Sequence, residues 1–208
     1  MPRKSCCVNI RIESRPSLRA GSERMTDMVA SVDALAAPVT AVPESAMWLD
    51  ARALNCYEGD AARRSWLLTP GLLTQRIREA AGAGFSMQVL HEAAVGDEHI
   101  REIAMSAAGV PWLFAQTRIP RSTLESQDWL SRVGQQTLGE ALATRTDISR
   151  APFRYALLTA DAGVVARALQ MAALPPQALW VRHSAFAAGG APFDLYEVFL
   201  PQMGRTPP

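Results

Sequence analysis

The sequence is poor in cysteine and lacks long apolar runs. Its three cysteines, with Cys6 and Cys7 adjacent and Cys56 remote, offer neither a disulfide framework nor the ligand spacing of a zinc site. No window approaches the roughly 18 uninterrupted apolar residues that span a bilayer. The first residues, MPRKSCC, carry positive charge but no continuous apolar segment before Arg11, unlike a secretory signal. These absences predict a cytoplasmic protein without membrane insertion.

An excess of charge and the best-known catalytic motifs are also missing. The 208 residues carry a formal net charge of +1, so electrostatics give no reason to expect nucleic acid as a partner. There is no phosphate-binding loop, dinucleotide glycine pattern, HExxH or GxSxG sequence. With only three histidines in the chain, a catalytic triad has weak support. We interpret His183, within WVRHSAF, as a hydrogen-bonded strand residue rather than a base.

The composition is that of a soluble globular domain with an appendage. Apolar residues make up 49% of the chain and charged residues 20%. Residues 1–44, rich in Arg and Ser and then in Ala, Val and Pro, show no sustained period, which predicts a disordered N-terminal extension. A short helix at Val29–Ala36 is the alternative. Residues 45–204 are predicted to form one folded domain.

Hydrophobic periodicity within residues 45–204 predicts helices mixed with antiparallel strands. The expected helices are Asp60–Leu68, Pro70–Ala81 with Thr69 as N-cap, Ser122–Val133, one following Thr137, and Asp161–Leu174. The expected strands are Phe85–His91, two within His99–Pro120, two within Thr144–Ala160, Ala178–Phe186 and Leu195–Leu200. The fold class is therefore α+β, in a single domain.

The stretch His99–Pro120 is typical of a β-hairpin, but its apolar strands contain two arginines. Its two apolar-rich runs meet at Ala107-Ala108-Gly109, and Pro120 ends the second run. Arg101 and Arg118 lie within these runs, and a guanidinium in a buried strand requires a carboxylate or a ligand.

A candidate carboxylate lies near the other end of the chain, in DLYEVFLP. Period-2 alternation places Glu197 on one face with Leu195 and Phe199. A structural Arg–Glu pair that bridges two strands is as good an interpretation of this acid as a ligand site.

Thr137-Leu138-Gly139-Glu140 has the pattern of a capping box, with Thr as N-cap and Glu three residues later. The backbone N–H groups near Leu138 would then be available to an anion at the helix start, although this feature alone favours an ordinary capped surface helix without a ligand. Together, Arg101, Leu138 and Glu197 suit a small anionic ligand with a hydroxyl group at its other end.

Four segments, taken in order, resemble the chorismate pyruvate-lyase family of ubiquinone biosynthesis: WLLTPGLLTQRI, REIAMSAAGVPWLFAQTRIP, TLGEAL and DLYEVFLP. The resemblance spans roughly Leu54 to Met203. It implies an antiparallel sheet of about six strands, with helical flaps that cover a buried site without a cofactor. It also implies conversion of chorismate into 4-hydroxybenzoate and pyruvate.

The resemblance also implies roles for individual residues. Arg101 would bind the ring carboxylate with the Leu138 N–H, and Glu197 would hydrogen-bond the 4-hydroxyl, so that Arg101 and Glu197 are the candidate catalytic pair. Leu73 occupies a flap position where the family has methionine, and Arg182 would lie near the enolpyruvyl carboxylate. Relative to the family's compact pattern, the chain has extra length around Asp161–Gln177, which we expect to decorate the surface.

Alternative functions differ in their predicted ligands. Effector-binding domains of some bacterial regulators share the family's fold and sense small molecules without turnover. They normally follow a winged-helix domain, for which residues 1–44 are too short and irregular. A scaffold would leave Arg101 and Glu197 as an interior ion pair, and a related enzyme would release 3-hydroxybenzoate. We expect a monomeric enzyme whose partners are chorismate and 4-hydroxybenzoate.

Overall fold

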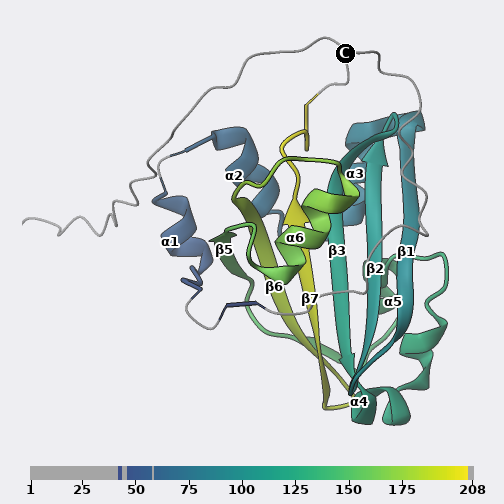
Figure 1. Ribbon diagram of the computed structural model, residues 1–208. Helices are drawn as coiled ribbons and strands as arrows, with labels where there is room; N and C mark the ends of the chain where they lie inside the picture. Colours follow the sequence, from purple (N-terminus) through teal and green to yellow (C-terminus); the bar gives the residue numbers. More distant parts are fainter. Residues whose placement is uncertain (1–41, 44–45, 58, 206–208) are drawn as a thin grey trace, which may run out of the picture.

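A seven-stranded antiparallel sheet organises the chain in the computed structural model, which describes residues 42–43, 46–57 and 59–205 (Figure 1). The strands are β1 (Phe85–Val95), β2 (Glu98–Ala107), β3 (Val110–Pro120), β4 (Ile148–Arg150), β5 (Arg154–Leu158), β6 (Leu179–Ala188) and β7 (Ala191–Phe199). The helices are α1 (Ala51–Asn55), α2 (Ala61–Leu67), α3 (Leu73–Ala81), α4 (Arg121–Ser126), α5 (Leu138–Ala143) and α6 (Gly163–Met171). The predicted extension, residues 1–44, lies almost entirely outside the described residues.

The sheet is close to the width expected from the sequence. Its order is β1-β2-β3-β7-β6-β4, and β5 pairs with β6 as well. β4 and β5 occupy different lengths of the same β6 edge, because Ile148 pairs with Ala188 whereas Arg154 pairs with His183. Pro152 lies between β4 and β5. Because proline has no N–H to donate, it interrupts the pairing with β6, which accounts for two short strands instead of one continuous strand.

The predicted hairpin is confirmed. β2 and β3 pair from Glu98 with Pro120 to Ala107 with Val110. The turn between them requires positive φ at Ala108 (48°) and Gly109 (77°). Gly109 adopts this conformation at no steric cost, which explains a glycine at the end of the turn.

Both faces of the sheet are covered, by different helices. On one face, buried side chains of α1, α2 and α3 pack against Ile103 and Leu113. On the other face, α6 packs Val165 and Ala168 against Phe114 and Val198. Figure 1 shows α6 crossing in front of β3, β7 and β6. Successive strand side chains point to opposite faces, so each strand contributes to both layers.

The segment Asp161–Gln177 is therefore part of the core, and the expectation that it decorates the surface is wrong. Arg167 of α6 is 3% exposed and pairs through Nε and Nη2 with the fully buried carboxylate of Glu102. Gln116 donates to the same carboxylate over 2.9 Å. Helix α6 thus closes the sheet face opposite the one that carries Arg101 and Glu197.

Two predicted helices differ from those observed. Helix α3 begins at Leu73 rather than Pro70, and Thr69 does not cap it, because the Thr69 hydroxyl donates back to the carbonyl of Trp66 at 2.7 Å. The segment predicted as one helix, Ser122–Val133, divides at Gln127 into α4 and a 3-10 helix at Asp128–Arg132. Local sequence patterns did not reveal either break.

Candidate active site

A cavity of about 320 Å³ lies between the sheet and the starts of α3 and α5. This volume is at the small end of the roughly 300–1,000 Å³ range of ligand pockets. Apolar side chains dominate the lining, with three arginines and one carboxylate among them. The lining includes all five residues singled out in the sequence: Leu73, Arg101, Leu138, Arg182 and Glu197.

The sheet register sets the distance between Arg101 and Glu197. Arg101 on β2 pairs with Thr117 on β3, and Ala115 on β3 pairs with Glu197 on β7. The two functional side chains are therefore two strands apart, roughly 10 Å, and two residues, roughly 7 Å, apart along the strands. This separation leaves room for a single ring between a guanidinium and a carboxylate.

Arg101 is held by the protein while part of its guanidinium remains available. It is 2% exposed, and its Nη2 donates to the carbonyls of Gly134 (2.7 Å) and Gln136 (2.9 Å). Its Nε lies 3.4 Å from Oε2 of Glu92 on β1. Burial lowers the pKa of Arg101, and Glu92 opposes that shift. No acceptor within the described residues bonds to Nη1, so this donor is available to an anion in the cavity.

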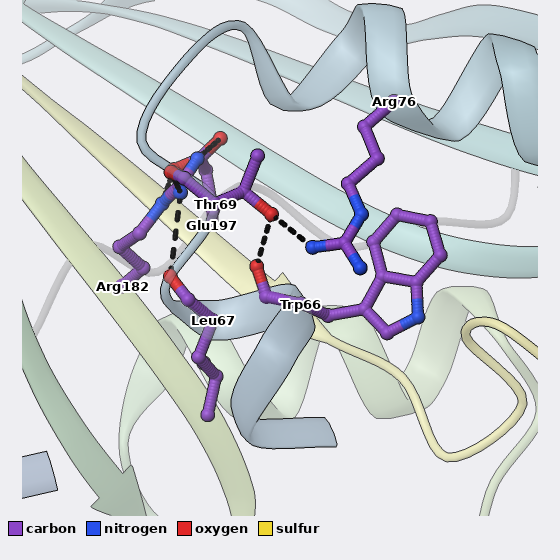
Figure 2. A network of polar contacts seen from close by, with 6 residues as sticks. All are labelled: Trp66, Leu67, Thr69, Arg76, Arg182 and Glu197. Carbon is purple, nitrogen blue, oxygen red and sulfur yellow. Dashed lines mark hydrogen bonds and ion pairs between the residues drawn. The ribbon is translucent and has the colours of Figure 1, made fainter. Parts of the chain in front are cut away.

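Glu197 is paired with Arg182 and not with Arg101 (Figure 2). Nε and Nη2 of Arg182 donate to the two carboxylate oxygens of Glu197 over 2.6 and 3.0 Å. The pair is buried and bridges β6 and β7, where the two residues face each other in register. The expectation of a strand-bridging Arg–Glu pair thus fits Glu197 with Arg182 as its partner. Arg118, the other unexplained cation, forms an ion pair with Glu98.

The same arginine ties the connection between α2 and α3 to the site. Nη1 of Arg182 donates to the carbonyls of Thr69 (3.0 Å) and Leu67 (3.4 Å). Arg76 donates to the Thr69 hydroxyl over 2.7 Å, and its guanidinium lies 4.1 Å above the Trp66 ring. Figure 2 shows these contacts converging on Thr69. The flap residues Leu68–Leu72 are therefore held over the cavity by charged groups from both sides.

The second flap is the start of α5, where the predicted capping box is confirmed. The Thr137 hydroxyl accepts from the N–H of Glu140 (3.2 Å), and the Glu140 carboxylate accepts from the N–H of Thr137 (3.0 Å). A Cβ placed on Gly139 would lie 3.2 Å from Leu72, so the two flaps approach closely here. A larger residue than glycine would require the Leu72 side chain to shift by a few tenths of an ångström.

The charge of Glu140 is predicted to stabilise the α5 flap only above acid pH. Hydrogen bonds from Thr137 and the charge of Arg78 lower the pKa of Glu140 below its usual value of 4.5. A lowered pKa in the folded state contributes stability above the unfolded pKa and loses it as pH falls. Glu140→Gln keeps a capping-box side chain, so it should cost below about 1 kcal/mol at pH 7, given the exposed side chain. That cost should shrink as the pH falls from 4.5 through the lowered pKa of Glu140, measured by denaturant unfolding. Glu125→Gln, at an exposed glutamate of α4, is the control, and equal pH dependence in both variants would contradict the prediction.

Several lining residues were missed in the sequence analysis. Ser184 follows Arg182 by two positions on β6, so the period-2 pattern could have placed it on the same face. Arg150 and Phe153 could not have been found in this way, because they reach the cavity only through the pairing of β4 and β5 with β6. His183 is a strand residue on the opposite face and bonds to Asp194 over 2.7 Å, as interpreted from the sequence.

The described residues contain no group of three or more His, Cys, Asp or Glu side chains arranged to hold a metal ion. Among the helices that the structure describes, none is both long and apolar enough to cross a bilayer.

An antiparallel sheet, two short helical flaps and a small cavity lined by three arginines and one glutamate define an α+β domain. The family model for chorismate lyase matches residues 42–205, and the chain belongs to this family. A relative from Aromatoleum aromaticum, named "Probable chorismate pyruvate-lyase", is 35% identical over 167 residues, covering 71% of this chain and 89% of its own. One of the same name from Shewanella loihica is 30% identical over 150 residues (67% and 79%). Among solved structures, the C-terminal domain of the histidine utilization repressor of Pseudomonas syringae has a TM-score of 0.38 at 8% identity, over 60% of this chain and 92% of that one.

Proposed function

We propose that this chain is a cytoplasmic, monomeric lyase that converts chorismate into 4-hydroxybenzoate and pyruvate as the first step of ubiquinone biosynthesis. The observation that carries the proposal is the placement of Arg101 and Glu197 on opposite sides of one buried cavity. A ring carboxylate would bind at Nη1 of Arg101, helped by the Leu138 N–H. The 4-hydroxyl group would then point toward Glu197.

The reaction breaks the bond between ring carbon C3 and the enolpyruvyl oxygen, and the ring loses the proton on C4. The ring becomes aromatic, and the enolpyruvate takes up a proton on carbon to give pyruvate. Because aromatisation drives the step, the protein has mainly to orient the substrate and to stabilise the departing negative charge. Three arginines in the lining of a mostly apolar cavity would supply that stabilisation.

Glu197 can accept a hydrogen bond from the 4-hydroxyl group while it remains paired with Arg182. A carboxylate offers about four lone-pair positions, and Arg182 occupies one on each oxygen. The Arg182 pair holds the carboxylate plane in place, so the remaining positions face a fixed direction. Glu197 is therefore proposed to touch the substrate, and Arg182 to position Glu197.

The test is to incubate purified full-length protein with chorismate, a metal chelator and no nucleotide, and to identify the products by chromatography. The expected result is 4-hydroxybenzoate and pyruvate in equal amounts, above the spontaneous decay of chorismate. Release of 3-hydroxybenzoate would identify the related enzyme. Unchanged chorismate together with tight 4-hydroxybenzoate binding would instead identify a sensor. The pathway is tested by restoring ubiquinone to a strain that lacks its own 4-hydroxybenzoate-forming enzyme.

A further inference from the structure

Ser184 presents an unsatisfied hydroxyl group to the cavity. It is 1% exposed, it lines the cavity, and its Oγ has no hydrogen-bond partner among the described residues. Burying a hydroxyl without a hydrogen-bond partner costs free energy. The sheet register places Ser184 on β6 opposite Leu195, next to the Arg182–Glu197 pair. A ligand that accepts from this hydroxyl would recover the cost.

Arg150 places a positive charge on the side of the cavity where Ser184 lies. It lies on β4 opposite Phe186, lines the cavity and is exposed, unlike the buried Arg101 and Arg182. No salt bridge joins it to a carboxylate in the part of the chain that the structure describes. Its guanidinium lies 3.7 Å from the Phe153 ring, which orients it.

Arg150 and Arg182 flank one aromatic ring, and their charges repel. The Arg182 guanidinium lies 4.3 Å from the Phe153 ring that Arg150 also contacts. Burial lowers the pKa of Arg150, and the charge of Arg182 lowers it further. Glu197 forms its ion pair with Arg182, and its charge only partly offsets the repulsion at Arg150, so an additional anion would relieve the repulsion further. The lining carries three arginines against one glutamate, a balance that suits a ligand with two negative charges.

We propose that Ser184 and Arg150 form the subsite for the second carboxylate of a dicarboxylate ligand whose first carboxylate binds Arg101. Given the proposed function, on which this assignment rests, that group is the enolpyruvyl carboxylate of chorismate. The family resemblance placed Arg182 there, but Arg182 already donates to Glu197 and to the Leu67 and Thr69 carbonyls, so Ser184 and Arg150 offer the more available donors. The subsite therefore distinguishes substrate from product, since 4-hydroxybenzoate has only one carboxylate.

The experiment compares two inert ligands, of which only one carries the second carboxylate. The probes are 4-hydroxybenzoate and 3-(carboxymethoxy)-4-hydroxybenzoate, whose ether group cannot eliminate, and affinities are measured by calorimetry. The variants of the full-length protein are Arg150→Gln, Arg150→Lys and Ser184→Ala. The control is Arg132→Gln, which removes an exposed arginine that pairs with Asp128 outside the cavity.

The wild type should bind the dicarboxylate more tightly than 4-hydroxybenzoate. Arg150→Gln and Ser184→Ala should each weaken dicarboxylate binding by about tenfold, the effect of a hydrogen bond to a charged group, and leave 4-hydroxybenzoate binding unchanged. Arg150→Lys should restore part of the loss, and Arg132→Gln should alter neither affinity.

Equal weakening of both probes, or no preference for the dicarboxylate in the wild type, would overturn the subsite. These binding measurements need no turnover, so they separate the subsite from the proposed function. A wild type that leaves chorismate intact but shows the predicted probe selectivity would refute the lyase and retain the subsite. In an active enzyme, the same variants should raise KM for chorismate while inhibition by 4-hydroxybenzoate stays constant.

Discussion

Arg101→Ala is expected to lower kcat/KM for chorismate by at least about tenfold, because a charge-assisted contact to a carboxylate contributes about 1.5–3 kcal/mol. The guanidinium is preorganised by the carbonyls of Gly134 and Gln136 and by Glu92, so a substrate carboxylate meets a donor already oriented. Binding of 4-hydroxybenzoate should weaken in parallel, since it retains the ring carboxylate. The measurements are steady-state kinetics and product binding by calorimetry.

Loss of Arg101 will also affect the fold, which requires a matched control. Removing it leaves Glu92 without its closest cation and two carbonyls without a donor. Arg118→Ala removes an ion-paired arginine from the adjacent strand of the same hairpin, on the opposite face of the sheet. Both variants should melt at lower temperature, but only Arg101→Ala should lose activity and product binding. If kcat/KM falls equally in both, the assignment of Arg101 to the substrate carboxylate is wrong.

The sequence predicted features whose causes are local. The capping box at Thr137 and Glu140 depends on residues three apart, and it formed as predicted. The hairpin depends on two apolar runs and a glycine turn, and its register followed. The face occupied by Glu197 follows from strand alternation, and Leu195 and Glu197 line the cavity together. In each case the pattern and the structure involve the same few neighbouring residues.

The partners of the charged residues could not be predicted, because tertiary structure selects them. Arg101 lies opposite Glu92 because β1 pairs with β2, and Glu197 lies opposite Arg182 because β6 pairs with β7. The position of helix α6 could not be predicted from the sequence for the same reason. Its amphipathic pattern predicts a helix but cannot indicate which sheet face it covers, and Glu102 on β2 provides the buried carboxylate that receives Arg167.

Glu197→Gln is expected to reduce both activity and stability. The amide retains one carbonyl acceptor for Arg182 but loses the charge, which leaves a 3%-exposed guanidinium without its counter-ion. Breaking a buried pair in this way costs on the order of 3 kcal/mol. The value of kcat/KM should fall by at least about tenfold, because the group that accepts a hydrogen bond from the 4-hydroxyl is no longer a carboxylate. Unfolding curves and steady-state kinetics measure the two effects separately.

A double variant distinguishes a role in the reaction from a role in folding. In Glu197→Gln with Arg182→Gln, two neutral amides replace the ion pair, so no buried charge is left uncompensated and part of the lost stability should return. If Glu197 touches the substrate, activity must stay low while the melting temperature recovers. If activity returns with stability, the carboxylate serves only to hold β6, β7 and the Leu68–Leu72 flap together. The two outcomes separate because stability depends on the Arg182–Glu197 pair as a unit, whereas the proposed chemistry needs the charge of Glu197 itself.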